Sequence, residues 1–491
     1  MSGTAGGYTM IGVLWGMGIL VTILGARSPR SPRPVVLLAL AALAGSTTLA
    51  GLLWNSIPSA TFAGGGMRLD GFASFVQVFV LLGALCALLL GNHAQHRWRT
   101  GSSGLILLSA AGASLLVMAW DLMGVMVGFI GALIPLWGLS ALYAGESGRE
   151  GALKGMVIGV LGTALIGLGS ALMLARTGTT HFLGIRIYLS NADWIGSDPL
   201  LVAALALVLA GVGCMIAAVP FHMWFVDVVE ALPIPGSLLL SGGILAAGLA
   251  AICRMLLVGF EPVADSGPGY LSWTSVLHGV GIAALVVCNA MALVQRRLKR
   301  MIGYLAAGQA GLVLVTLAAV GGIDQPAVNR ALGGILVFLA VFAVNWVGLF
   351  VAVSAVEDGQ GNDPKIGRLR GLAKDHPWLT VAVGLALLCM AGMPLTAGFF
   401  SRLYLLETLV EAGWTGTAVV AALSLGLVLV MSLGLVAAMV MRPGKAGTEV
   451  RVTGPLTLVA ILVSVTILLF GILPEGILDI AIRSAGSLMT W

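Results

Sequence analysis

The sequence has little charge for its length. Only 9% of its 491 residues are Asp, Glu, Lys or Arg, whereas 59% are apolar. Soluble domains carry about 25% charged residues, so the composition excludes an ordinary soluble protein. Apolar runs of about 18 residues or more recur along the chain, and each can cross the hydrocarbon core of a bilayer as a helix. The sequence therefore predicts an all-α, polytopic integral membrane protein embedded in a lipid bilayer.

The motifs of redox and metal chemistry are also missing. Each of the five cysteines lies alone in an apolar run, without the Cys-x-x-Cys or Cys/His spacing of iron–sulfur and zinc sites. There is no dinucleotide-binding fingerprint and no pair of haem ligands. We expect no metal, no cofactor and no catalytic residue in this chain. The net charge of +5 indicates no nucleic-acid partner, because in a membrane protein the location of the charges matters more than their sum.

Fourteen apolar segments are candidate membrane spans. They cover residues 8–26, 34–54, 71–91, 102–119, 122–143, 155–176, 199–218, 236–258, 273–293, 301–321, 332–355, 378–410 with a break, 416–441 and 453–473.

Basic residues are unevenly distributed between the loops that join these segments. One alternating set of loops holds 18 of the 25 Lys and Arg. By the positive-inside rule this set faces the cytoplasm. An even number of spans places both termini on the same side of the membrane, and this assignment makes it the external side. The set consists of Arg27, Arg30, Arg33, Arg97, Arg99, Arg149, Lys154, Arg296, Arg297, Lys299, Arg300, Lys365, Arg368, Arg370, Lys374, Arg442, Lys445 and Arg451.

The stretch AAVPFHMWFVDVVEALPIP, residues 217–235, separates two apolar segments. Residues 221–232 can form a short amphipathic helix on the cytoplasmic surface, with Asp227 and Glu230 towards water or a partner. The face expected against the bundle consists of Phe221, Trp224, Phe225 and Val228. His222 has two interpretations. It either caps or hydrogen-bonds a helix end, or it handles protons.

Two segments contain a proline at a point where a spanning helix would be interrupted. Pro220 closes the seventh segment and Pro394 interrupts the twelfth. Segments four to eight and nine to thirteen form two units of five, and the interrupted segment is the fourth in each. Because each unit has an odd number of spans, the second unit is inverted relative to the first. Paired broken helices in inverted repeats are typical of ion-transporting folds. We expect four parts: 1–100 with three spans, 101–258 as the first five-helix repeat, 272–441 as the second, inverted repeat, and 442–491 with the last span and tail.

Three stretches resemble the antiporter-like membrane subunits of respiratory complex I, and among these they are most similar to the subunit N family. They are AAVPFHMWFVDVVEALPIPGSLLL, NAMALVQRRLKRMIGYLAAGQAG at 289–311, and RGLAKDHPWLTVAVGLALLCMAGMPLTAGFFSRLYLL at 370–406. The resemblance implies a non-catalytic, proton-translocating subunit of an NADH-quinone oxidoreductase in a bacterial plasma membrane. It also implies other membrane-arm subunits as partners, with NADH, flavin, iron–sulfur clusters and quinone bound by partner chains.

The resemblance further implies a proton relay. The family has a Glu in span five, a Lys in each of spans seven and eight, and a Lys or Glu in span twelve. A buried Lys beside a Glu can exchange a proton near neutrality. The matching positions for the first three are Ile130, Met215 and Leu245, so we expect proton conduction in the first half to be reduced or absent. Span twelve has Arg402, and a histidine common in span ten corresponds to Gln309.

Three interpretations remain open. The chain is a complex I-like subunit with a silent first half, a conducting subunit whose relay uses other residues, or part of a multi-subunit cation/proton antiporter or membrane-bound hydrogenase. A structural spacer in the membrane arm is a fourth possibility from a different class. Fold alone does not separate them.

The other candidate proton-path residues each have a structural alternative. Arg402 either ends a conduction path, or it snorkels or pairs with Glu407 or a neighbouring subunit. Gln309 and Asn345 order water or form interhelical hydrogen bonds. Lys154 lies at a span edge, where it either joins a relocated relay or marks the cytoplasmic side. Asp121 is also at a span edge, and helix capping is the alternative there.

Overall fold

The structure is a computed structural model that describes residues 3–27, 32–56, 59–91, 101–143, 145–191, 198–264, 272–321, 323, 325–357, 364–444, 450 and 452–489. Of the basic residues that carry the orientation prediction, Arg30, Arg97, Arg99, Lys445 and Arg451 lie outside the described residues.

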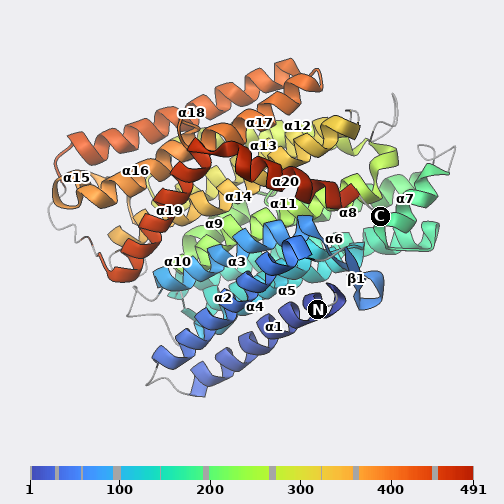
Figure 1. The fold of residues 1–491 in the computed structure, drawn as a ribbon, viewed down its shortest axis with the longest axis horizontal. Coiled ribbons are helices and arrows are strands. Elements are labelled where there is room, and N and C mark those ends of the chain that lie inside the picture. The colour runs from blue at the N-terminus through green and yellow to red at the C-terminus, as the bar shows by residue number, and fades with distance from the viewer. Residues whose placement is uncertain are drawn as a thin grey trace.

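The described chain is a bundle of long helices that run roughly side by side (Figure 1). The first half contains α1 (Gly3–Arg27), α2 (Pro32–Ser56), α3 (Gly71–Gly91), α4 (Ser102–Met118), α5 (Leu122–Tyr143), α6 (Gly145–Thr177), α7 (Phe182–Ser190), α8 (Pro199–Met215), α9 (Met223–Ala231), α10 (Ile234–Leu238) and α11 (Leu245–Arg254). The second half contains α12 (Trp273–Leu293), α13 (Leu298–Val320), α14 (Gln325–Val356), α15 (Leu372–Asp375), α16 (Pro377–Ala391), α17 (Ala397–Glu411), α18 (Thr415–Met441), α19 (Gly454–Ile472) and α20 (Pro474–Met489).

Short elements complete the chain. A two-stranded hairpin pairs β1 (Ala60–Phe62) with β2 (Met67–Leu69). Two π-helical segments, η3 (Leu239–Ile244) and η4 (Met255–Gly259), flank α11. The 3-10 segments are η1 (Ala63–Gly65), η5 (Glu261–Val263) and η6 (Ile366–Leu369).

Every predicted span coincides with a helix, and the all-α membrane fold is confirmed. Eleven helical segments of the described chain are long and apolar enough to cross a membrane. Three shorter apolar helices, α4, α8 and α16, match the remaining predictions. A shorter helix can cross only if it is continued by a second piece or tilted, so the count of fourteen spans stays a prediction. The hairpin, α7 and α20 were not predicted, because none is a long apolar run.

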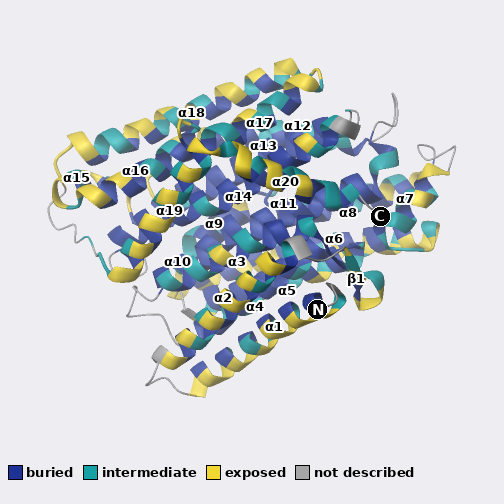
Figure 2. Ribbon diagram, in the orientation of Figure 1, coloured by how far each residue is buried: buried dark blue, intermediate teal, exposed yellow. Residues whose placement is uncertain are grey.

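Helices in the middle of the bundle are buried on all sides. The span made of α10, η3, α11 and η4 is buried throughout its most apolar window, as is α13, and these segments are dark blue in Figure 2. By contrast, α1 and α18 lie at opposite edges and expose one face. Membrane proteins bury small residues where backbones approach closely. Gly112 is such a position, since a Cβ there would lie 2.1 Å from the backbone of α5.

Both broken helices are present. α8 ends at Met215 and α9 begins at Met223, and Pro220 lies in the irregular segment between them. α16 ends at Ala391 and α17 begins at Ala397, with Pro394 in the gap. These breaks interrupt backbone hydrogen bonding inside the bundle, where only protein groups or trapped water can replace it.

The face of α9 that was predicted to lie against the bundle is buried, but the helix lies deeper than a surface position. α9 packs between α6 and α13, and Trp224, Phe225, Val226, Val228 and Val229 are all buried. Because five of its nine residues are buried apolar side chains, α9 is part of the packed bundle between α6 and α13.

The two ends of the described chain lie at the same end of the bundle (Figure 1). The hydroxyl of Tyr8, near the start of α1, accepts a hydrogen bond from the Ala63 N–H beside the hairpin. The hydroxyl of Ser487, in the last turn of α20, accepts one from the Phe72 N–H at the start of α3. An even number of membrane crossings is consistent with this arrangement.

Candidate functional site

The structure packs the three residues that were assigned from the sequence to the first half of the relay as apolar side chains within the bundle. Met215 is the last residue of α8 and is 4% exposed, and Leu245 is the first residue of α11 and is 2% exposed. Ile130 lies half-buried in α5. A Cβ added to Gly162 of α6 would lie 3.1 Å from the Met215 Cε atom, so the Met215 side chain is packed against protein.

Arg402, on α17, is buried and binds the end of the other half of the broken helix. Its Nη1 donates to the carbonyl oxygens of Cys389 at 3.0 Å and Gly398 at 2.9 Å. Its Nη2 donates to the Met390 carbonyl oxygen at 2.7 Å and to Gln309 Oε1 at 3.0 Å. The Cys389 and Met390 carbonyls belong to the last turn of α16, which carries the negative end of the helix dipole. Arg402 therefore acts as a cationic cap of α16.

Two glycines allow the ends of α16 and α17 to approach each other closely at this site. Gly392, just after α16, has φ +73°, in the left-handed region that favours glycine. A Cβ added to Gly398 would lie 1.8 Å from the Cys389 carbonyl oxygen. The two helix ends therefore meet at van der Waals contact, and the guanidinium spans the junction.

A cavity of about 10 Å³ lies beside Arg402, lined also by Asn345, Phe338, Trp346 and Ser401. This is about the space that one water molecule needs. Asn345 donates to the Met390 Sδ atom at 3.3 Å, and its Oδ1 has no partner among the described atoms. Gln309 Nε2 also has no hydrogen-bond partner among the described atoms. Because Gln309 binds Arg402 and Asn345 lines the cavity beside it, the three residues form a single polar cluster in the second half.

The pairing of Arg402 with Glu407 is not formed. Glu407 Oε1 lies 3.5 Å from Arg330 Nη2. Among the described residues no carboxylate is within 4.0 Å of Arg402, so carbonyl dipoles and the Gln309 amide stabilise its charge. Because Arg402 is only 6% exposed, it does not snorkel.

Ion pairs at the predicted cytoplasmic end link α9 to both of its neighbours. Asp227 accepts from Lys154 of α6 at 2.9 Å and from Arg300 of α13 at 3.0 Å. Glu230 accepts from Arg300 at 2.7 Å and pairs with Arg297 at 3.1 Å. Asp227 and Glu230 were expected to face water or a partner, but they bind basic residues of the same chain. Lys154 is therefore part of an ion-pair network.

A buried charge cluster at the opposite end was missed. Asp70, just before α3, accepts from Arg254 of α11 at 2.7 Å, and the Asp70 Oδ2 atom lies 3.5 Å from Arg68 Nε in β2. The side chains of Asp70 and Arg254 are fully buried and that of Arg68 is 3% exposed. Both guanidinium groups face the Trp120 ring, at 4.4 Å for Arg68 and 5.2 Å for Arg254. The signal in the sequence was an arginine inside an apolar run, which predicts a buried partner.

The two remaining candidates are Asp121 and His222. Asp121 Oδ1 accepts from the Gly124 N–H at 2.5 Å, so Asp121 caps α5 at its N-terminus. Burial raises the pKa of the Asp121 carboxyl above its ordinary value, although the Gly124 N–H opposes this. His222 is buried, precedes α9 without capping it through its side chain, and lies 6.2 Å from the Tyr304 ring between centroids. Its Nδ1 has no hydrogen-bond partner among the described atoms.

No group of three or more His, Cys, Asp or Glu in the described part of the chain has the arrangement of a metal site. What remains is a membrane bundle with two broken helices, a buried arginine at one break and apolar residues beside the other. This combination defines the class as an antiporter-like membrane subunit.

Comparison with known proteins identifies the family. The transmembrane family described as NADH:quinone oxidoreductase/Mrp antiporter matches residues 119–429. The chain therefore belongs to this family, and the resemblance noted from the sequence is confirmed.

Individual relatives cover nearly the whole chain. NADH-quinone oxidoreductase subunit N of Dehalococcoides mccartyi is 30% identical over 470 residues, which are 94% of this chain and 95% of that protein. Subunit N of Deinococcus radiodurans is 31% identical over 425 residues, 85% of this chain and 83% of the relative.

Solved structures agree on the fold. A chain of respiratory complex I from Thermus thermophilus with bound aureothin has a TM-score of 0.79 and 26% identity, covering 96% of this chain and 98% of that one. A chain of the Mrp complex from Dietzia sp. has a TM-score of 0.86 at 19% identity, covering 99% and 98%. At that identity the second match shows the fold alone.

Proposed function

We propose that the chain is a membrane-arm subunit of a proton-translocating NADH-quinone oxidoreductase, and that its first half conducts few or no protons. The relatives named subunit N, matched over almost their full length, support the first part of this proposal. NADH, flavin, iron–sulfur clusters and quinone would be bound by partner subunits. The subunit would lie in a bacterial plasma membrane with both termini external. Its two inverted repeats, 101–258 and 272–441, would be flanked by the parts 1–100 and 442–491.

The second part rests on where the charged groups of the first half lie. Met215 and Leu245 are buried apolar residues at the positions where the family carries lysines. Among the described residues, the two largest ionic clusters of this half lie towards its ends: Asp70 with Arg68 and Arg254 at one, and the α9 network at the other. Arg254 lies five residues before the end of its span at Gly259, which is too near the end to replace a relay residue at the centre.

An apolar centre is physically incompatible with proton storage. A charged side chain at the middle of a bilayer costs about 2.5–3.5 kcal/mol on insertion scales. Substitution by Met, Leu or Ile removes this cost along with the site that would hold a proton. Water cannot fill the gap unless polar groups anchor it, and none of the three side chains offers one.

The hydration of this region can be tested with a cysteine at position 215. We expect Met215→Cys in the assembled complex to react with a water-soluble methanethiosulfonate reagent no faster than the unsubstituted chain, whose own cysteines set the background. Ser147→Cys, at an exposed position at the start of α6, is the positive control and should be labelled readily. Labelling of Met215→Cys as fast as that control would reveal a hydrated path and refute the silent first half.

The identity of the complex is tested separately by extraction in a mild detergent. We expect hydrophilic redox subunits to co-purify with this chain, and the purified assembly to oxidise NADH with a quinone acceptor. Recovery of small membrane partners alone would assign the chain to a cation/proton antiporter instead. Hydrophilic partners that oxidise hydrogen but not NADH would assign it to a hydrogenase.

A further inference from the structure

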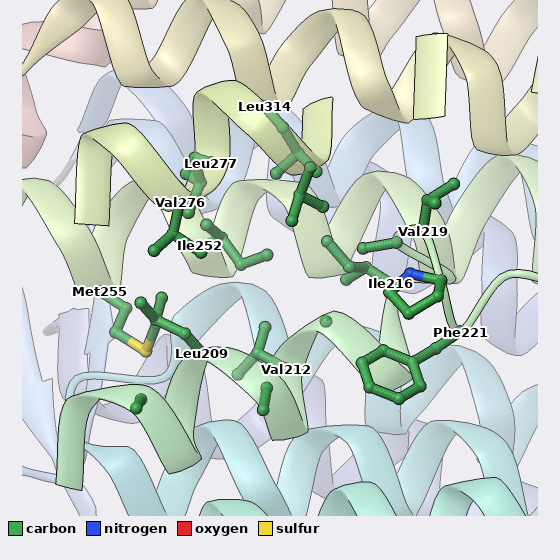
Figure 3. A pocket seen from close by; sticks show the side chains of 16 residues that line it. Leu209, Val212, Ile216, Val219, Phe221, Ile252, Met255, Val276, Leu277 and Leu314 are labelled. Carbon is green, nitrogen blue, oxygen red and sulfur yellow. The ribbon is translucent and has the colours of Figure 1, made fainter. Parts of the chain in front are cut away.

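An apolar pocket of about 260 Å³ lies between the two halves of the bundle, beside the first broken helix (Figure 3). One wall is α8 and another is formed by the first turns of α12, with Ile252 and Met255 of the eighth span and Leu314 of α13 behind them. The pocket extends to the break itself, where Val219, Pro220 and Phe221 line it. Small-molecule pockets in proteins begin at about 300 Å³, so this space is large enough for part of a ligand.

The pocket exists because the helices on its two sides pack away from each other. Among the described residues, α8 packs on α6 and α12 packs on α13, while α8 and α12 share no extensive contact. The α8 wall carries Ala206, Ala210 and Gly213, which lie on one helical face by their spacing. A Cβ added to Gly213 would meet only the Ala218 Cβ, at 3.8 Å, so the missing side chain leaves open space.

The lining determines what can occupy this space. None of the lining side chains is charged or polar. An apolar cavity of this kind stays dry, and a void leaves its wall atoms without dispersion partners. The apolar lining therefore favours a hydrocarbon occupant.

The pocket also opens towards an exposed apolar surface of the bundle. Leu209, Val276 and Val280 line it and are partly exposed, and Val286 and Val287, further along α12, are 38% and 42% exposed. Hydrocarbon from the surrounding bilayer can therefore enter sideways. We propose that this pocket binds an acyl chain of a membrane phospholipid, which fills the gap between the two halves and packs against the break at Pro220.

The proposal is tested by photolabelling of the purified assembly in phosphatidylcholine vesicles. The vesicles contain a trace of a phosphatidylcholine whose acyl chain carries a diazirine, and the labelled residues are mapped by mass spectrometry. We expect labels to concentrate on pocket residues such as Leu209, Met255 and Leu277, relative to the lipid-facing residues of α18. Gly213→Leu, which fills the pocket, should reduce pocket labelling to the level seen on α18. Gly434→Leu, a matched change at an open position of α18, should leave pocket labelling unchanged.

Three results would overturn this assignment. The first is equal labelling of the pocket and α18, which requires no variant and so stands even if Gly213→Leu fails to fold. The second is displacement of the label by a long-chain quinone but not by unlabelled phosphatidylcholine, which would make the occupant an isoprenoid tail. The third is protection of the pocket by a neighbouring subunit, seen as cross-links from these residues to another chain.

Discussion

Replacing Asp70 with asparagine is expected to destabilise the protein by about 3–5 kcal/mol, which is the usual cost of removing one partner from a buried ion pair. Asparagine has nearly the same shape, and its Oδ1 can still accept from the Ala73 N–H, which Asp70 Oδ1 accepts at 2.8 Å. The change therefore isolates the loss of charge. Arg254, already lacking partners at Nε and Nη1 among the described atoms, would lose its counter-charge. The measurement is the thermal unfolding midpoint of the purified assembly in detergent.

Asp198→Asn is the matched control. Asp198 also caps a helix, since its Oδ1 accepts from the Leu200 N–H at 2.9 Å, and it also pairs with an arginine, Arg176. That arginine side chain is 41% exposed, so water stabilises it and the expected loss is about 0–1 kcal/mol. Equal effects of the two substitutions would show that Asp70 is not the counter-ion of a buried cluster.

Replacing Arg402 with methionine is expected to destabilise the broken helix in the second half without changing the number of protons moved per electron pair. The variant loses four charge-assisted hydrogen bonds, worth about 1.5–3 kcal/mol each. Removing a buried cation regains about 2.5–3.5 kcal/mol, so we expect a net loss of roughly 3–9 kcal/mol. The proton ratio should stay constant because a guanidinium does not release its proton in proteins.

The experiment compares unfolding midpoint and proton-to-electron ratio in reconstituted vesicles. Arg330→Met serves as the control. The Arg330 side chain is 60% exposed and pairs with Glu407 at 3.5 Å, so its loss should leave both quantities nearly unchanged. A lower proton ratio in Arg402→Met, with normal assembly, would mean that the Arg402 charge takes part in conduction. The cap would then be a secondary role.

Much of the fold could be predicted because a membrane span is a local signal. A run of apolar residues must form a helix in lipid, whatever its neighbours are. The same applies to Pro220 and Pro394, since proline lacks the N–H that an uninterrupted helix needs. Asp121 was also predictable as a cap, because its partner at Gly124 is three residues away.

The candidate site was predictable only in part. Gln309, Asn345 and Arg402 stood out because polar residues in apolar runs are rare and seek partners. Their actual partners are backbone carbonyls of α16, which carry no signal in the sequence. The interpretation that paired Arg402 with Glu407 assumed an acidic partner, whereas the Arg402 guanidinium binds backbone carbonyls and the Gln309 amide.

The sequence by itself determined that this is a helical membrane protein of the antiporter-like family, and where its long apolar helices run and break. Only the tertiary structure decided that α9 lies inside the bundle, that Asp70 meets an arginine 184 residues away, and that a pocket remains between α8 and α12. The reason is that apolar length specifies a helix, whereas its rotation and its neighbours depend on how side chains from distant helices pack together.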